Sequence, residues 1–507
     1  MRSDPRKLDG QRFDLVVIGG GIHGAAFARE AVLRGARTLV IEREDFAAGT
    51  SSRSSRLVHG GVRYLEQGHL SLVREALGER ERLLRLAPHL VRPLPMLMPF
   101  LGASWWSRQR ARIGLWLYDR LAGGSSMPGS RRCSAADCLR LFPGLCSDGL
   151  RGGVLFWDAA TRDAPLTVAV LEDAAAEGAV LCNHTELVEA RGDGLVLRDL
   201  LANAEVTVRA GQVLNAAGPR VDHVRQRLGL EGPDLVRASR GSHLVLAPRN
   251  VETALAAFLP DGRIQFVVPH RDGTLCGTTE VEGDPGERDG DAPAEDVDYL
   301  LGALAQLFDR PPEAADIVAT YAGWRALPTG RGPAGALNRE AFLVPENAGV
   351  GRVHTIVGGK LTTHRSFAER GIGDILGSGS GTPSPTRERP LPGGDGLREP
   401  SDPLWWRWGS RAVALRAAAG HALDLLEPIC PHRDLLALEV RHAFALGAMT
   451  FADVFERRLF DLRGPCAEPA CRERQRELFV RFAAASGVIA GVDLVDAGAP
   501  PPPEAKA

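Results

Sequence analysis

Three glycines near the N-terminus have the spacing of a nucleotide-binding turn. Gly19, Gly21 and Gly24 form Gly-x-Gly-x-x-Gly. The acidic residue Glu42 follows at about the 20-residue interval that a ribose-binding carboxylate requires. Because glycine lacks a Cβ, the backbone can approach a pyrophosphate closely. The chemistry indicated is the binding of a dinucleotide.

The surrounding sequence supplies the elements that would position this turn. Residues 15–18 are a continuous apolar run, typical of a strand buried on both faces, and residues 37–41 are expected to form a second buried strand that ends at Glu42. Between them, the alanine-rich residues 25–28 allow a helix to pack closely on the sheet. The order strand, turn, helix, strand predicts a Rossmann-like unit with the pyrophosphate at the helix N-terminus.

Composition limits the other classes of function. A length of 507 residues predicts two or three domains, and a net charge of −2 provides no field that would recruit nucleic acid. No apolar run reaches the roughly 20 residues of a membrane span, and the N-terminus lacks the apolar core of a signal peptide. We therefore expect a cytoplasmic protein. The eight cysteines are scattered, so we expect reduced thiols and no metal site. Five of them lack both Cys-x-x-Cys spacing and nearby histidine pairs: Cys133, Cys138, Cys146, Cys466 and Cys471.

Lysine is rare in this chain. Only three of the 61 basic residues are lysines, and Lys360 alone lies away from the chain ends. In so arginine-rich a sequence, an internal lysine is either an accident or a position where a compact ammonium is needed.

Several longer runs carry a resemblance to a known family. In chain order they are GGGIHGA, TSSRSSRLVHGGVRYLE, LNAAGP, RGSHLVL, YAGWRAL and VGGKLTTHR. The chain resembles the FAD-dependent glycerol-3-phosphate dehydrogenases over nearly its whole length. The serine-rich run and the Gly-Gly-Lys-Leu-Thr-Thr run are specific to that family, whereas many flavoproteins share the glycine motif.

The resemblance and the apolar patterns together predict an α/β fold. A discontinuous Rossmann-like FAD-binding domain is joined to an antiparallel β-sheet substrate domain and a C-terminal α-helical domain. The first is expected from residues 1–90, 150–235 and 336–376, the second from residues 91–149 and 236–335, and the third from residues 397–496. Residues 377–396 have the composition of a linker, and residues 497–507 are expected to be a disordered tail.

The resemblance implies a non-covalently bound FAD. Its cofactor-binding residues would be Gly19, Gly21, Gly24, Glu42, Thr50, Ser51, Ser52, Gly60, Gly61, Ala217, Gly218, Gly358, Gly359, Lys360, Leu361 and Thr362. The Gly358-Gly359 turn is expected to begin a helix. Unpaired amides at such a helix start suit the negative charge that develops on the flavin pyrimidine carbonyl during reduction.

The resemblance also implies oxidation of sn-glycerol 3-phosphate to dihydroxyacetone phosphate, with hydride passing from carbon 2 to the flavin N(5) atom. A lone histidine in an apolar strand is more often a core residue, but the resemblance assigns His243 to the substrate pocket. Imidazole has an ordinary pKa of about 6.5, which suits a general base. The catalytic set would be His243, Arg325 and Lys360, and the substrate-binding set Arg63, Tyr64, Arg325 and Arg339.

Several alternatives stay open at this stage. The family passes electrons to quinone at the inner membrane face, and residues 105–121 mix tryptophans with arginines as a membrane-surface segment does. A core helix with an arginine-rich outer face explains the same pattern. We expect a homodimer. The rival functions are a flavin-dependent amino-acid or amine oxidase and a non-catalytic flavin-binding protein. Separately, Ala326 and Glu280 depart from the family pattern and leave substrate choice open.

Overall fold

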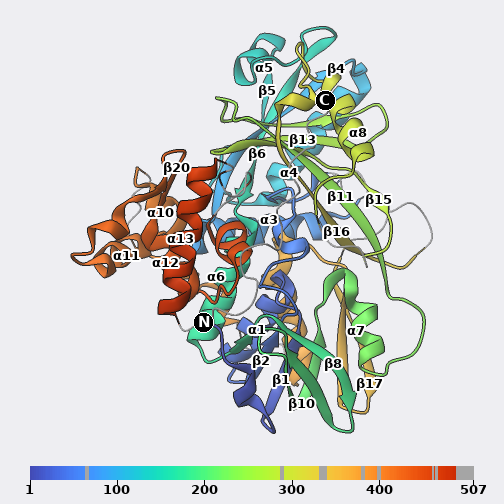
Figure 1. Cartoon of the computed structure of the whole chain (residues 1–507). Coiled ribbons are helices and arrows are strands. Elements are labelled where there is room, and N and C mark those ends of the chain that lie inside the picture. The colour runs from blue at the N-terminus through green and yellow to red at the C-terminus, as the bar shows by residue number, and fades with distance from the viewer. Residues whose placement is uncertain are drawn as a thin grey trace, which may run out of the picture.

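The computed structural model describes residues 1–62, 65, 68–285, 290–330, 340–377, 383–396, 401–459, 462, 466 and 468–486. Figure 1 shows a sheet with helices at the bottom, a second large sheet at the top, and a group of helices at one side. The predicted fold class is therefore confirmed.

The first sheet contains the glycine motif. Its strand order is β17-β18-β10-β1-β2-β7, and the neighbours between β18 and β7 are parallel. The bounds are β1 (Arg12–Ile18), β2 (Thr38–Ile41), β7 (Val180–Cys182), β10 (Ala204–Asn215), β17 (Phe342–Ala348) and β18 (Gly351–Val357), with β8 (Thr185–Arg191) and β9 (Gly194–Asp199) as an antiparallel extension from β10. The strands come from three separate stretches of the chain, as a discontinuous domain requires.

Four helices accompany this sheet: α1 (Ile22–Leu33), α6 (Asp163–Ala176), α7 (Val221–Arg227) and α9 (His364–Leu376). Helix α1 directly follows the glycine turn and is buried on nearly all sides. It packs against both α6 and α9. The small residues that follow the glycines allow this close approach, because larger side chains would hold the helices apart.

The second sheet has the order β15-β11-β14-β13-β12-β4-β6-β3, with β16 paired to β11 and β5 paired to β6. Its pairs are antiparallel except β12 with β4. The bounds are β3 (Leu57–Val58), β4 (Val91–Leu101), β5 (Arg131–Cys133), β6 (Leu150–Thr161), β11 (Val236–Leu246), β12 (Ala254–Phe258), β13 (Ile264–His270), β14 (Gly273–Gly277), β15 (Val281–Glu282) and β16 (Ile317–Pro328). Helices α3 (Leu70–Leu86), α4 (Trp105–Ala122), α5 (Ala135–Leu141) and α8 (Ala294–Ala305) pack around it.

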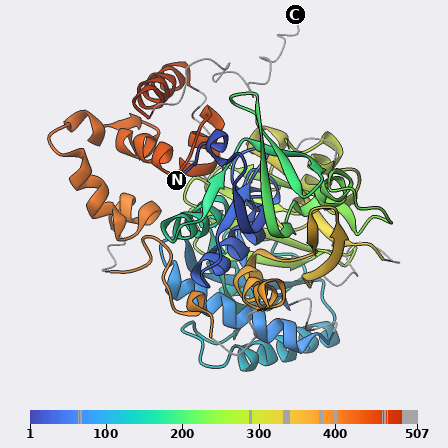
Figure 2. The same cartoon turned by 90° about the horizontal axis from the view of Figure 1, so that it is seen from below.

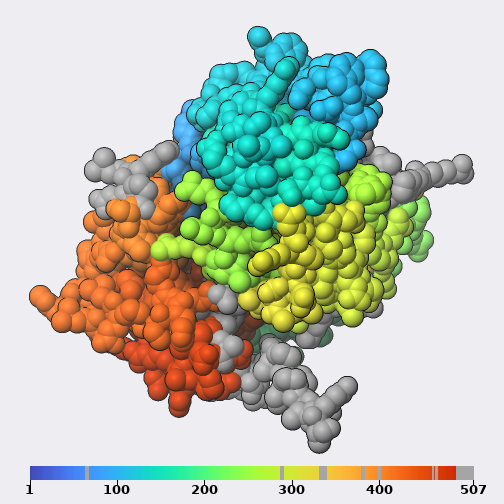
Figure 3. Space-filling view, turned by 90° about the horizontal axis from the view of Figure 1, so that it is seen from above, coloured from blue at the N-terminus to red at the C-terminus, as the bar shows by residue number. Residues whose placement is uncertain are grey.

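The C-terminal part forms a lobe with its own hydrophobic core. It contains α10 (Pro403–Trp408), α11 (Arg411–Ala419), α12 (Ala437–Ala445), α13 (Pro469–Ala485) and a short hairpin of β19 (Pro428–Cys430) and β20 (Arg433–Leu436). Figures 2 and 3 show this lobe, in orange and red, standing beside the main body.

Part of the expected linker is packed against the first sheet's helices. The hydroxyls of Ser384 and Thr386 donate hydrogen bonds to Glu30 on α1, at 2.5 and 2.8 Å. Arg389 forms an ion pair with Asp173 on α6 at 3.0 Å. Composition alone indicates a flexible connection here, but these buried polar contacts hold the segment in place.

Candidate active site

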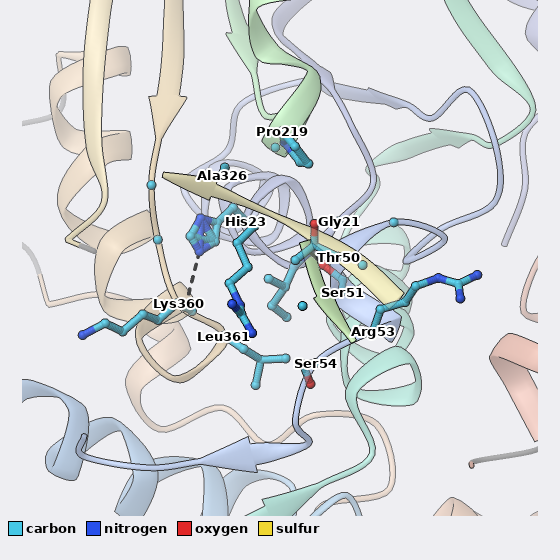
Figure 4. A pocket seen from close by; sticks show the side chains of 18 of the residues that line it. Gly21, His23, Thr50, Ser51, Arg53, Ser54, Pro219, Ala326, Lys360 and Leu361 are labelled. Atoms are coloured by element: carbon cyan, nitrogen blue, oxygen red, sulfur yellow. Dashed lines mark hydrogen bonds between the residues drawn. The ribbon is translucent and has the colours of Figure 1, made fainter. Parts of the chain in front are cut away.

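One cavity of about 510 Å³ brings the two sheets' functional residues together (Figure 4). Its walls include the glycine turn after β1, the serine-rich loop, the end of β10, strands β11 and β16, and the turn after β18. This volume lies in the range of about 300–1,000 Å³ typical of ligand sites.

The glycine turn is tight for a steric reason. Gly19 has a φ of +114°, and a Cβ there would lie 2.5 Å from the carbonyl oxygen of Ala216. A Cβ on Gly24 would collide with the carbonyl oxygen of Gly19. Gly19 and Gly21 line the cavity, whereas Gly24 only allows the helix to pack. The predicted motif therefore presents bare backbone to the cavity at the start of α1, which fits a pyrophosphate.

Glu42 is fixed by two backbone amides. The Gly20 amide donates to one carboxylate oxygen at 2.7 Å, and the Glu44 amide donates to the other at 2.9 Å. Burial raises the pKa of Glu42, and these two hydrogen bonds oppose that effect. Since a carboxylate accepts about four hydrogen bonds, it retains capacity for the hydroxyls of a ribose.

The serine-rich loop contributes some predicted residues to the cavity and not others. Ser51 lines the cavity and accepts a hydrogen bond from the Ile22 amide at 2.9 Å, which fixes the loop to the start of α1. Thr50 also lines it and donates to the Trp324 carbonyl at 2.5 Å. Ser52 is not among the lining residues, since its hydroxyl donates to carbonyl groups of its own loop.

The two predicted loop glycines also differ from each other. Gly60 is not at the cavity: its amide donates to the Tyr118 hydroxyl at 2.8 Å, and a Cβ there would lie 2.7 Å from Leu77. Gly61 lines the cavity, as do Ala217 and Gly218 after β10.

The turn after β18 has the predicted form. Gly358 and Gly359 have φ values of +75° and +116°, and a short 3-10 turn (Leu361–Thr363) leads into α9. A Cβ on Gly359 would lie 2.8 Å from Nδ1 of His23, so only glycine fits. Among the described residues, no side chain caps the start of the 3-10 turn or of α9.

Lys360, Leu361 and Thr362 line the cavity at this turn. In Figure 4 the Lys360 side chain extends away from Ser51 and Ser54. Its carbonyl oxygen faces the His23 ring, 3.4 Å from Nε2.

His243 lies on β11 in the cavity wall. Its Nε2 atom is 2.9 Å from the Ser55 hydroxyl, and its ring stacks on Tyr321 with 4.8 Å between centroids. Within the described part of the chain, its Nδ1 atom is buried without a hydrogen-bond partner. Burial first, and then Arg325 and Arg56, lower the pKa of His243 to about 3. The imidazole is therefore neutral near pH 7, as a proton acceptor must be.

Arg325 lies on β16, beside His243. Its guanidinium donates to the Thr278 hydroxyl at 2.8 Å and to the Thr279 carbonyl at 3.2 Å. Gly241 on β11, which pairs with Gly323 on β16, makes room for it, because a Cβ on Gly241 would lie 2.7 Å from Cζ of Arg325.

Gly323 provides the same kind of space for Arg53. A Cβ on Gly323 would lie 2.6 Å from the Cβ of Arg53, a second cation of the cavity wall. Arg53, Ser55 and His23 also line the cavity, although they are not among the predicted site residues. Arg53 and Ser55 lie in the serine-rich run and His23 lies in the glycine motif, next to residues that were predicted.

Three predicted substrate-binding residues, Arg63, Tyr64 and Arg339, lie outside the described residues. Ala326 and Glu280, where the chain departs from the family pattern, both line the cavity.

Comparisons with known proteins agree with this geometry. Residues 14–365 match the family model of FAD dependent oxidoreductases. Glycerol-3-phosphate dehydrogenase 2 of Mycobacterium tuberculosis is 36% identical over 486 residues, covering 90% of this chain and 82% of the relative. The glycerol-3-phosphate dehydrogenase of Synechocystis is 33% identical over 499 residues, covering 90% of each.

Among solved structures, glycerol-3-phosphate dehydrogenase from Bacillus halodurans complexed with FAD superposes with a TM-score of 0.74. It is 27% identical in sequence, and the match covers 96% of this chain and 92% of that one. The family resemblance and the FAD cofactor expected from the sequence are confirmed. The chain belongs to the FAD-dependent oxidoreductases and, within them, to the glycerol-3-phosphate dehydrogenase family.

Proposed function

We propose that this protein oxidises sn-glycerol 3-phosphate to dihydroxyacetone phosphate with FAD as the hydride acceptor. The observation that supports this most strongly is the composition of one cavity. It contains a bare-backbone turn for a dinucleotide and, facing it from the other sheet, a neutral histidine beside an arginine. Relatives covering about 90% of the chain are named for the same reaction.

The chain's own residues position the reactants. Gly19, Gly21 and the start of α1 would hold the pyrophosphate, and Glu42 would hold the ribose. FAD, when bound, supplies the two-electron acceptor. The amides of the 3-10 turn Leu361–Thr363, which follows Gly358 and Gly359 and has no side-chain cap among the described residues, would stabilise negative charge on the flavin ring.

His243 takes the hydroxyl proton of the substrate. Its Nε2 atom faces the Ser55 hydroxyl at 2.9 Å, so a substrate hydroxyl beside Ser55 lies within reach of the ring. Arg325 binds the anionic end of the substrate, because guanidinium forms paired hydrogen bonds with phosphate oxygens. Arg325 is one of the cations that lower the pKa of His243. A phosphate dianion bound to Arg325 offsets its positive charge, so substrate binding raises the pKa of His243 and makes the imidazole a stronger base.

The test is anaerobic reduction of the bound flavin by three compounds. Glycerol 3-phosphate is expected to bleach the flavin absorbance, whereas glycerol, which lacks the phosphate, and D-amino acids are expected to leave it unchanged. Bleaching by an amino acid alone would favour the oxidase function, and no bleaching by any compound would favour a non-catalytic flavoprotein.

Electron transfer to quinone at a membrane surface is a second part of the proposal. On α4, Trp106 is 72% exposed, Ile113 64% and Trp116 55%, and arginines lie among them. Indole rings beside cations suit the headgroup region of a bilayer. Among the described helices, none is long and apolar enough to cross a membrane.

Co-sedimentation with anionic lipid vesicles tests this surface. The fraction of protein that sediments with vesicles should be several-fold lower for the double variant Trp106→Ser/Trp116→Ser than for the wild type. The control Val413→Ser removes a 68% exposed side chain on α11 and should sediment like the wild type. Equal binding by all three would contradict a role of α4. The homodimer expected from the sequence stays a prediction, which analytical ultracentrifugation measures.

A further inference from the structure

Four potential metal ligands gather in the C-terminal lobe, and none of them lines the flavin cavity. They are Cys430, His432, Cys466 and Cys471, and their ligand atoms all lie within 4.8 Å of one another. The three cysteines are 5%, 9% and 6% exposed, whereas His432 reaches solvent. Cysteine spacing alone does not predict this cluster, because Cys430, Cys466 and Cys471 show no Cys-x-x-Cys pattern.

The distances match a tetrahedral metal centre. The Nδ1 atom of His432 is 3.5 Å from Sγ of Cys466 and 3.5 Å from Sγ of Cys471. In a tetrahedral zinc site, with Zn–S of about 2.3 Å and Zn–N of about 2.0–2.1 Å, the nitrogen and each sulfur are separated by about 3.5 Å. The two nitrogen–sulfur separations are therefore those that a central ion requires, and the remaining ligand atoms lie within 4.8 Å of one another.

The ligands come from elements that fix them. Cys430 ends β19 and pairs with Arg433 on β20, so His432 lies in the tight turn between them. Cys471 lies in the first turn of α13, just after Pro469. The three cysteines form a small apolar cluster separate from the main core of the lobe. An ion here would connect α13 to the hairpin.

A second group of titratable residues, Asp45, His184 and Asp453, does not have this character. His184 bonds to Asp453 at 2.8 Å, and Arg458 bonds to Asp45 at 2.8 Å. Arg457 forms ion pairs with both carboxylates, at 2.8 Å to Asp45 and 2.6 Å to Asp453. These acids are already neutralised by guanidinium groups, which occupy the place that a cation would take.

We propose that Cys430, His432, Cys466 and Cys471 form a structural zinc site that joins α13 to the β19–β20 hairpin. Thiolate and imidazole are the ligands that zinc prefers, and four protein ligands leave no open position for a reacting water. The site thus stabilises the lobe and takes no part in the flavin chemistry. Binding is coupled to loss of the thiol protons, since the cysteines ligate as thiolates.

The test measures metal in the full-length flavoprotein, purified without chelators under reducing conditions. Elemental analysis by mass spectrometry should find about one zinc per chain. His432→Ala and Cys471→Ser should each lower the zinc content at least fivefold. The control His421→Ala removes an exposed histidine of the same lobe and should retain full zinc content. FAD content, read from the flavin spectrum, should be equal in all four proteins.

Cobalt provides a readout that does not depend on any variant. The reduced, metal-depleted wild-type protein should bind one Co²⁺ per chain with the strong visible absorption of tetrahedral thiolate coordination, and zinc should displace it. A wild-type protein that contains no zinc as isolated, and binds neither Zn²⁺ nor Co²⁺ after reduction, would overturn the proposal. A Cys466–Cys471 disulfide in the peptide mass spectrum of protein isolated without reductant would overturn it equally.

Discussion

Replacing Gly241 by alanine should displace Arg325 without disturbing the flavin. The new Cβ would lie 2.7 Å from Cζ of Arg325 and 2.9 Å from the Thr278 hydroxyl. The crowded atoms belong to the end of a flexible arginine and to a hydroxyl, not to the backbone, so the sheet can accept the methyl group. The guanidinium must then leave its position beside Thr278 and Thr279.

The magnitude follows from the contacts that the displaced guanidinium loses. A hydrogen bond involving a charged group contributes about 1.5–3 kcal/mol. Losing one such bond to the substrate phosphate therefore lowers kcat/KM by about 10- to 150-fold. The control Gly302→Ala adds a methyl group in α8 with nothing within 4 Å and should leave kcat/KM unchanged.

The assay is flavin reduction by glycerol 3-phosphate in the stopped flow, at a series of substrate concentrations. Most of the effect should appear as weaker substrate binding, with the FAD content and melting temperature of Gly241→Ala close to those of Gly302→Ala. A variant with wild-type kcat/KM would show that Arg325 does not contact the substrate. A variant that loses FAD would show that Gly241 supports the cofactor instead.

Three further variants or treatments test other parts of the site. His243→Asn should lower the flavin reduction rate by about 100-fold or more with normal FAD content, because general base catalysis contributes about 10²–10⁴; a wild-type rate would make His243 a core residue. Lys360→Arg should lower turnover nearly as much as Lys360→Ala, since a guanidinium is broader than an ammonium in the Gly358-Gly359 turn; wild-type turnover in the arginine variant would remove Lys360 from the site. Acid precipitation should release FAD into the supernatant, and flavin left in the pellet would indicate a covalent link.

The nucleotide-binding half was predictable because its signals are local. The glycine turn, the strand before it and Glu42 lie within one short stretch, where residue spacing fixes geometry. Within the serine-rich loop, spacing was insufficient. Ser51 faces the cavity and Ser52 does not, because the two hydroxyls leave a 3-10 turn in different directions.

Contacts between distant segments could not be read from the chain. The pairing of Gly241 with Gly323 depends on the register of β11 and β16, and the contact of Ser55 with His243 depends on how the two sheets meet. The cysteine cluster likewise depends on α13 returning to the β19–β20 hairpin. These contacts are tertiary, and no local pattern specifies them.

The measurement that tests the central claim most directly is a single anaerobic turnover with its product counted. The FAD-loaded protein is mixed with excess sn-glycerol 3-phosphate in the absence of any electron acceptor, and dihydroxyacetone phosphate is quantified against reduced flavin. We expect about one product molecule for each flavin reduced, because the oxidation of one substrate molecule releases two electrons and one FAD accepts two. Reduced flavin without dihydroxyacetone phosphate, or no reduction at all, would contradict the proposed function.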